Sequence, residues 1–183
     1  MADWHLGSLG AAPAAWKVHP VMPLRKPGSV QSYRPISLLS GLLKLFEYCL
    51  LGRVGAPLAA QLSPSQGGGQ VGADAQAAAL ISLLQVRRAQ GKGRPGRGHT
   101  WMAYLDVEAA FCRASPALLL RELWDAGVAD EWHEIAALYA EVSAYAWYAG
   151  RPTPRWEVKA GVLQGSVLSP LLFNVYMLSL IHI

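Results

Sequence analysis

The segment around residue 106 constrains the fold more than any other part of the sequence. Residues 102–111 read MAYLDVEAAF, an apolar run that stops on a single carboxylate, Asp106. Residues 100–106 predict a buried strand, and an unpaired ionised carboxylate in an apolar setting costs several kcal/mol. A chain that keeps Asp106 at a strand end must therefore place it in a polar site with partners. The simpler alternative is that Asp106 caps a turn and Phe111 belongs to the core.

Length and composition indicate a folded chain of about one domain. Its 183 residues are 52% hydrophobic and 15% charged, which excludes a disordered protein. The longest apolar stretch, from Leu42, is broken by Lys44 and Glu47, so it predicts an amphipathic helix and no membrane span. The N-terminus lacks a signal-peptide pattern. Two cysteines, Cys49 and Cys112, fit neither a disulfide framework nor a zinc site, which predicts an intracellular protein, nuclear or cytoplasmic.

Charge is distributed unevenly along the chain. Residues 1–100 contain 11 Lys and Arg against 3 Asp and Glu, whereas residues 101–183 contain 5 against 9. A basic half joined to an acidic half suits a protein that holds a polyanion with one part and performs metal chemistry with another. An uneven distribution of solvated surface charges explains the pattern equally well, so charge alone does not decide the function.

The order of predicted elements indicates an α+β fold, because helices and strands follow each other without the rhythm of repeated βαβ units. Proline and glycine steps predict irregular strands and turns over 21–40, and alternation around a Gly/Pro turn predicts a β-hairpin over 144–161. Residues 1–20 are expected to be a loose lead-in. The expected helices are 41–53, 75–90, 116–127 with Ser115 as its cap, 130–142, and a last helix that begins at Ser169.

Three segments carry residue types suited to nucleotidyl transfer. In the first, DVEAAF, a carboxylate fixed at the end of a strand can hold Mg²⁺ against triphosphate oxygens. An aromatic side chain one turn further, Phe111, can wall the pocket for a sugar. In the second, residues 161–177, two glycines bracket Gln164 before a Ser-Pro helix start, which lets the backbone approach a flat partner such as a base pair. An ordinary tight turn that caps an apolar helix explains this pattern equally well.

The third segment, residues 25–37, reads RKPGSVQSYRPIS. Its three cations, Arg25, Lys26 and Arg34, lie on a chain stiffened by prolines, which can aim guanidinium donors at a triphosphate. Basic loops of this kind are more often simply solvated, so the segment taken alone is a weak indicator.

Together these segments resemble the reverse transcriptase of non-LTR (LINE-type) retrotransposons. One family motif resembles KPG, then YRPISLL, then K..E; the next is Asp, four residues and an aromatic. The last is G-x-x-Q-G-S-x-L-S-P-x-L-F-N-x-Y, and this chain has every residue of it. The resemblance extends from about Val21 to Met177. The matching residues are Lys26–Gly28, Tyr33–Leu39, Lys44, Glu47, Asp106, Phe111 and the conserved letters of 161–176.

The resemblance implies a right-hand polymerase. Fingers would span 21–99 and a partial palm 100–177, with helices packed on a small antiparallel sheet that is incomplete at the C-terminus. The implied activity is that of an RNA-directed DNA polymerase, which uses an RNA template, a DNA primer, dNTPs and two Mg²⁺ ions, with no membrane partner. An RNA-templated RNA polymerase of the same fold stays open as an alternative. So does a non-catalytic nucleic-acid-binding remnant that uses only the basic half.

The resemblance assigns roles in catalysis to the segment after residue 105. Asp106 would be the catalytic, metal-binding carboxylate, with the Val107 backbone carbonyl beside it, and Phe111 would be the steric gate that excludes a ribose 2′-hydroxyl. Two Mg²⁺ ions need more than one carboxylate. The family supplies the others from a downstream Asp-Asp hairpin, and this chain has no acid after Glu157. We therefore expect a truncated piece of the enzyme that is inactive by itself.

The resemblance assigns substrate contacts to the other two motifs. Gln164 and Gly165 would line the nascent base pair and the template, and Arg34, with Lys26 as a second cation, would contact the incoming triphosphate. The chain departs from the family beside the gate, because Cys112 stands where the family usually has Asp.

Two further departures bear on the fold. The family loop that resembles Q-x-G-F-R-x-G-R-S-T survives only as Gln66, Gly68 and Gly72, so we expect it to be weakly anchored. The last six residues, LSLIHI at 178–183, break from the family pattern after Met177. They match the translation of a transposase end sequence used in sequencing adapters, and we expect this tail to be non-native.

Overall fold

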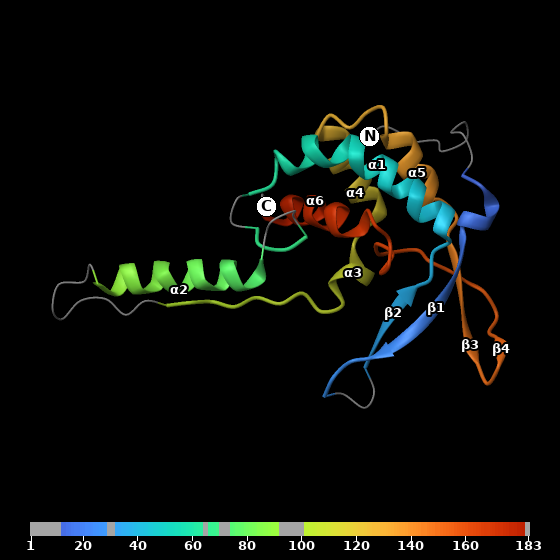
Figure 1. Ribbon diagram of the computed structural model, residues 1–183, viewed down its shortest axis with the longest axis horizontal. Helices are drawn as coiled ribbons and strands as arrows, with labels where there is room; N and C mark the ends of the chain where they lie inside the picture. The colour runs from blue at the N-terminus through green and yellow to red at the C-terminus, as the bar shows by residue number, and fades with distance from the viewer. Residues whose placement is uncertain (1–11, 29–31, 64–65, 70–73, 92–100, 182–183) are drawn as a thin grey trace.

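Two hairpins that are far apart in the sequence form one sheet, which extends from a body of helices (Figure 1). The computed structural model describes residues 12–28, 32–63, 66–69, 74–91 and 101–181. The strands are β1 (Val18–Arg25), β2 (Tyr33–Ser37), β3 (Ser143–Tyr148), β4 (Arg151–Pro152) and β5 (Trp156–Glu157). Their order is β2-β1-β3-β4, and β5 also pairs with β3. β1 therefore lies inside the sheet, with β2 along one side and β3 along the other.

The sheet confirms the α+β class but differs in detail from the sequence prediction. It is mixed, not purely antiparallel, because β1 and β3 run parallel and register Val18 opposite Ser143. Parallel strands need a long crossover connection, and helices supply it here. β1 begins at Val18, so the last three residues of the expected lead-in belong to the sheet; residues 1–11 lie outside the described chain. The second hairpin is confirmed, with Ala149 and Gly150 both at positive φ in its turn.

Capping serines begin two of the helices, and the cap at Ser115 confirms the sequence prediction. The Ser40 hydroxyl oxygen accepts a hydrogen bond from the Leu43 N–H (3.2 Å), and Ser115 accepts one from the Leu118 N–H (3.3 Å). Gly127, at a φ of +79°, follows the second of these helices. The helices are η1 (Ala14–Trp16, 3₁₀), α1 (Gly41–Ala59), α2 (Ala75–Gly91), α3 (Ala110–Arg113), α4 (Pro116–Asp125), α5 (Trp132–Tyr139) and α6 (Ser169–Ile181).

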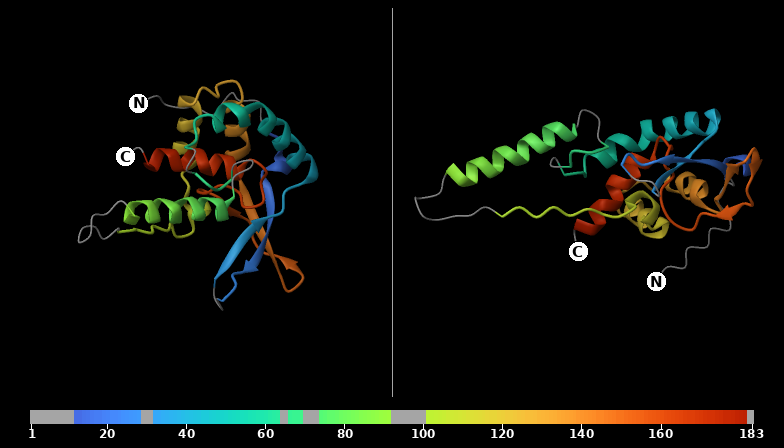
Figure 2. Two further views of the ribbon diagram at one scale, coloured as in Figure 1. Left: turned by 60° about the vertical axis from the view of Figure 1, so that its left-hand side comes forward. Right: turned by 90° about the horizontal axis from the view of Figure 1, so that it is seen from below.

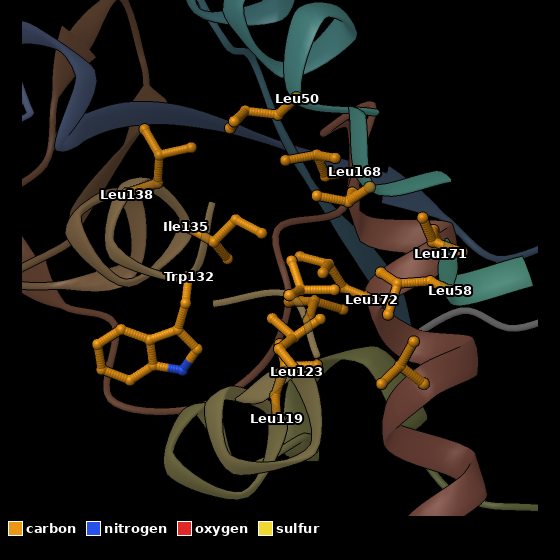
Figure 3. Close-up of a cluster of buried hydrophobic side chains, with 14 of the residues drawn as sticks. Leu50, Leu58, Leu119, Leu123, Trp132, Ile135, Leu138, Leu168, Leu171 and Leu172 are labelled. Carbon is orange, nitrogen blue, oxygen red and sulfur yellow. The ribbon is translucent and has the colours of Figure 1, made fainter. Parts of the chain in front are cut away.

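The hydrophobic core lies where α1, α4, α5 and α6 meet (Figure 3). Leucines from three of these helices, Leu50, Leu123 and Leu172, are at most 1% exposed. Burial of each such side chain stabilises the fold by about 1.5–3 kcal/mol. Trp132 of α5 adds a polar contact, because its indole N–H donates to the Leu120 carbonyl at 2.6 Å. The core thus fixes the helical body from which the sheet extends.

Helix α2 extends away from the helical body, and residues 101–107 run back toward that body (Figure 1); the right-hand view of Figure 2 shows that the two segments diverge. The predicted strand over 100–106 is wrong for the described residues: 101–107 pair with no described strand. Tyr104 and Leu105 are 84% and 95% exposed. A strand is stable only when a neighbour satisfies its backbone N–H and C=O groups, so an apolar pattern cannot form one by itself. Thr100 lies outside the described residues.

Other helix boundaries differ from the prediction by two residues or more. α1 continues past the predicted end at residue 53 to Ala59 and contains Pro57, whereas α5 is shorter than predicted at both ends. α6 continues through Leu178 to Ile181, so the described part of the expected tail is helical; residues 182–183 are outside the described chain. Within the part of the chain that the structure describes, no helix combines the length and apolar character needed to cross a membrane.

Candidate functional site

The turn at Gln164–Gly165 is docked against strand β2. The Ser37 backbone N–H donates to the Gln164 carbonyl at 2.6 Å. Gly165 has a φ of +115°, and a Cβ atom at this position would collide with the Ser37 carbonyl oxygen. Glycine fits because it tolerates this backbone conformation and has no side chain at the close approach. The glycine-bracketed motif is therefore joined directly to the YRPIS motif.

The same turn is held against α3, which carries the predicted gate. The Val162 N–H donates to the Phe111 carbonyl at 2.8 Å. The Gln164 side-chain amide donates to the sulfur of Cys112 at 3.4 Å. Sulfur is a weak acceptor, so Cys112 fixes the Gln164 amide less firmly than the usual aspartate of the family would at this position. The structure thus brings the Gln164 turn into contact with the segment that carries Phe111.

The Phe111 ring is half-buried and packs on the core. It stacks on Phe173 of α6, with ring centroids 4.5 Å apart and the planes inclined by 15°. Offset or stacked aromatic pairs of this kind contribute about 0.5–1.5 kcal/mol beyond their buried area. Phe111 therefore belongs to the core through the ring face that stacks on Phe173, as the simpler alternative proposed. This packing gives the ring a fixed orientation.

A buried carboxylate lies beneath the turn. Glu47 of α1 is 4% exposed; one of its oxygens accepts from the Ser166 hydroxyl (2.7 Å) and the other from the Val167 N–H (2.8 Å). Burial raises the pKa of Glu47, while these two hydrogen bonds and the nearby charge of Lys44 act in the opposite direction. α1 is thereby tied to the segment that follows Gln164–Gly165.

Sequence reasoning placed Glu47 in a family motif without giving it a structural role. A signal was present, because Glu47 falls on the helix face formed by Leu43, Leu50 and Val54, all of which are buried. A carboxylate on such an apolar face must find hydrogen-bond partners, or its burial is too costly. The sequence could not show that the partners would be Ser166 and Val167.

A serine network continues from Ser166 into the start of α6. The Ser166 oxygen accepts hydrogen bonds from the N–H groups of Leu168 and Ser169, both at 3.2 Å. The hydroxyls of Ser169 and Tyr139 lie 3.4 Å apart. Burial raises the pKa of Tyr139 to about 12, so its hydroxyl stays neutral and available for this contact. The network ties the turn, α5 and α6 together.

A cavity of about 190 Å³ lies beside the turn. Ser37, Cys112 and Gln164 contribute to its wall, and so does His19 of β1. His19 is 2% exposed, and its Nε2 atom has no hydrogen-bond partner within the described residues. Burial lowers the pKa of His19, which favours the neutral ring.

The two cations predicted to contact a triphosphate are exposed on the β1–β2 hairpin. Arg34 lies on β2 opposite Leu24, three residues before Ser37. Lys26 follows β1, and its backbone N–H donates to the Ser32 carbonyl at 2.9 Å. Neither side chain forms an ion pair with another described residue. Both charges are therefore free to meet an anionic ligand.

Asp106 and Val107 lie on the exposed segment that pairs with no described strand. Glu108, next in the sequence, forms an ion pair with Arg113 at 3.1 Å. Nowhere in the described ranges do three or more His, Cys, Asp or Glu side chains gather closely enough to hold a metal ion. Two Mg²⁺ ions about 4 Å apart need several carboxylate ligands. These residues therefore do not fit a two-metal centre by themselves.

The glycine-rich loop after α1 is anchored by α6. The Asn174 side-chain amide donates to the Gly68 carbonyl at 2.7 Å, and the Gln66 amide donates to the Asn174 carbonyl at 3.5 Å. Gly69 has a φ of +66°, and a Cβ atom there would lie 2.8 Å from the Asn174 amide nitrogen. The expectation of a weak anchor is wrong for residues 66–69, because Asn174 is 6% exposed and holds them directly. Gly72 lies outside the described residues.

Comparison with known proteins supports the motif analysis. A family model described as "Reverse transcriptase (RNA-dependent DNA polymerase)" matches residues 24–183. The chain belongs to the reverse transcriptase family. The match confirms the resemblance that the three motifs predict, and it includes the Gln164 turn, Phe111 and β2.

Two relatives of this reverse transcriptase chain come from Drosophila melanogaster. It is 27% identical over 178 residues to a protein described as a probable RNA-directed DNA polymerase from transposon BS. It is 29% identical over 170 residues to a protein described in the same way from transposon X-element. Each comparison covers 90% of this chain and 18% of the relative. The chain thus spans only about 18% of the length of these curated relatives.

A solved structure shares the fold. The apo telomerase from Candida tropicalis, truncated from its C-terminal domain, superposes with a TM-score of 0.59 at 13% sequence identity. The comparison covers 96% of this chain and 40% of the telomerase chain. The predicted polymerase-type α+β fold is therefore confirmed for this reverse transcriptase chain.

Proposed function

We propose that this reverse transcriptase chain forms the fingers and the first part of the palm of an RNA-directed DNA polymerase from a non-LTR retrotransposon. The whole enzyme would copy RNA into DNA through attack of a primer 3′-hydroxyl on a dNTP. The observation that carries the proposal is the hydrogen bond from Ser37 to the Gln164 carbonyl. It joins the strand that carries Arg34 to the turn that contacts the Phe111 segment.

The Gln164–Gly165 turn provides the surface for the nascent base pair. Gly165 is exposed, so its backbone is accessible to a base pair on the side that does not face Ser37. Gln164 is half-buried and its amide is held by Cys112, which limits its motion beside that surface. We assign both residues to contact with the base pair and the template.

The remaining substrate contacts come from the gate and the two exposed cations. Phe111 is fixed by its stacking on Phe173, and a fixed aromatic ring can exclude a ribose 2′-hydroxyl by steric contact. Arg34, with Lys26 as the second cation, would bind triphosphate oxygens, because a guanidinium group binds phosphate with two parallel hydrogen bonds.

Asp106 and Val107 would supply only some of the ligands of a two-metal site. The described residues supply one exposed carboxylate and one backbone carbonyl there, and two Mg²⁺ ions need further ligands. We infer that the chain alone does not polymerise.

Binding of a primer–template tests the proposed function. The 183-residue chain would be titrated against a fluorescent DNA primer annealed to a longer RNA template, with anisotropy as the readout. Gln164→Ala should weaken binding roughly tenfold, because it removes one contact at the centre of the interface. Gln61→Ala is the matched control, since Gln61 is exposed and its side chain donates only to the Ala126 carbonyl.

Two results would contradict the proposal. Equal affinities for the wild type, Gln164→Ala and Gln61→Ala would remove the turn from the binding face. Extension of the primer in the presence of dNTPs and Mg²⁺, abolished by Asp106→Ala, would show that the chain is complete enough for catalysis.

In a full-length protein, Phe111→Ala separates a DNA polymerase from an RNA-templated RNA polymerase, because loss of a gate would relax discrimination against rNTPs.

A non-catalytic nucleic-acid-binding role is the second candidate, and the basic first half favours it. Residues 1–100 carry 11 Lys and Arg against 3 Asp and Glu. Binding by such a surface depends on phosphate contacts and not on the shape of a base pair. Binding by such a surface would therefore tolerate both Gln164→Ala and Asp106→Ala. The polymerase assignment instead predicts weaker binding for Gln164→Ala.

A further inference from the structure

We propose that Glu47 is a positioning residue that holds the Gln164–Gly165 turn in the conformation that receives the base pair. The role in base-pair binding rests on the proposed function, whereas the hold on the turn itself does not. Glu47 would touch no substrate, and it would act only through the residues that follow the turn.

The turn is fixed from two sides by partners that are distant in the sequence. On one side, the Ser37 N–H of β2 donates to the Gln164 carbonyl. On the other side, Glu47 of α1 accepts hydrogen bonds from Ser166 and Val167, the two residues directly after Gly165. Before Gly165, the contacts of Val162 and Gln164 with α3 add a further anchor. After Gly165, Glu47 holds Ser166 and Val167, so loss of its carboxylate would release that side of the turn.

The carboxylate at position 47 stands among apolar side chains, and its hydrogen-bond partners after the turn explain why it is there. Its neighbours on the same helix face, Leu43, Leu50 and Val54, are buried apolar side chains. An apolar residue could not accept hydrogen bonds from the Ser166 hydroxyl and the Val167 N–H, and a buried donor left without a partner costs about 1–3 kcal/mol. A carboxylate at this position therefore serves the turn.

The geometry also transmits the hold to the start of α6. The Ser166 oxygen, whose hydroxyl donates to Glu47, accepts from the Leu168 and Ser169 N–H groups. With its hydroxyl committed to Glu47, the Ser166 oxygen points its lone pairs toward α6. Loss of Glu47 would free this hydroxyl to rotate, and the junction between the turn and α6 would loosen.

Hydrogen–deuterium exchange of the 183-residue chain tests the hold directly. In Glu47→Ala, amides of residues 163–169 should exchange about tenfold faster or more, because two buried hydrogen bonds are lost. Glu47→Gln should give an intermediate increase, since its carbonyl oxygen can still accept from Val167. Val54→Ala is the matched control: it removes a buried contact two turns further along α1, with no bond to the turn. Peptides from α4 report global opening in every variant.

A double-mutant cycle on primer–template affinity tests the positioning role. Glu47→Ala should weaken binding about as much as Gln164→Ala, and the double variant should be little worse than either single one. Such non-additivity is expected when one residue acts through the other. Val54→Ala combined with Gln164→Ala should instead be additive, because a general loss of stability is independent of the turn.

The outcomes separate this inference from the proposed function. If exchange at 163–169 rises no more in Glu47→Ala than in Val54→Ala, the inference is overturned. If exchange rises but Glu47→Ala and Gln164→Ala are additive in binding, Glu47 holds the turn but its positioning role in base-pair binding is overturned. If the wild-type chain binds no primer–template, the proposed function fails, and the exchange data alone decide whether Glu47 holds the turn.

Discussion

Gly165 is a position at which any side chain would disturb the fold of the site. Its φ of +115° disfavours any side chain, and a Cβ atom would collide with the Ser37 carbonyl. Gly165→Ala should therefore lower the free energy of unfolding by about 2–4 kcal/mol, measured by urea denaturation. Gly52→Ala is the control, because Gly52 lies within α1 with open space around its Cβ position. It should stabilise the protein by about 0.5–1 kcal/mol.

If Gly165→Ala lowers the free energy of unfolding no more than Gly52→Ala does, the turn can move away from β2 without cost.

The motifs single out Phe111 and Gln164, and the structure brings their two segments into contact, whereas their roles toward a substrate stay predictions. The role of Glu47 could not be predicted, because its partner Ser166 is 119 residues away and only the folded chain brings the two together. The sequence shows which residues are unusual, and the fold decides what each one contacts.

Helices and strands differ in how far the sequence alone predicts them. The start of α4 depends on Ser115 and Pro116, which act on the next few residues, so the prediction was correct there. α2 was also predicted to within one residue of its end. The apolar run at 101–106 has strand character, but it has no described strand beside it and stays unpaired. Pairing is a property of two segments, and one segment cannot specify it.

The contact between α6 and the loop at 66–69 gives a prediction at the same scale. Asn174→Ala removes the buried donor to the Gly68 carbonyl and should lower the free energy of unfolding by about 1–3 kcal/mol. Limited proteolysis should then cut the loop faster than in the wild type. Ser82→Ala is the control, because Ser82 donates to the Ala78 carbonyl at an exposed site on α2. Equal proteolysis of the two variants would show that Asn174 does not anchor the loop.

At the scale of the whole molecule, the sheet places two arginines at opposite edges. β2 carries Arg34 and β4 carries Arg151, and the strand order β2-β1-β3-β4 separates them by two strands. Both side chains are exposed. The α+β class could be predicted from the sequence, but this arrangement could not, because the parallel pairing of β1 with β3 joins segments more than 100 residues apart. Arg34 and Arg151 therefore offer a matched test of which edge of the sheet contacts nucleic acid.

Salt dependence of primer–template binding separates the two edges. A protein releases counterions from nucleic acid for each phosphate that it neutralises, so affinity falls linearly with salt on logarithmic scales. If Arg34 contacts phosphate, Arg34→Ala should weaken binding and reduce that slope by about one, whereas Arg151→Ala should leave the slope unchanged. Affinities of the wild type and both variants would be measured between 50 and 200 mM salt, a range over which phosphate contacts change affinity strongly. An equal loss of slope in both variants would indicate a diffuse basic surface and would favour the non-catalytic binding role. A loss confined to Arg151→Ala would place the nucleic acid on the opposite edge, away from β2 and the Gln164 turn.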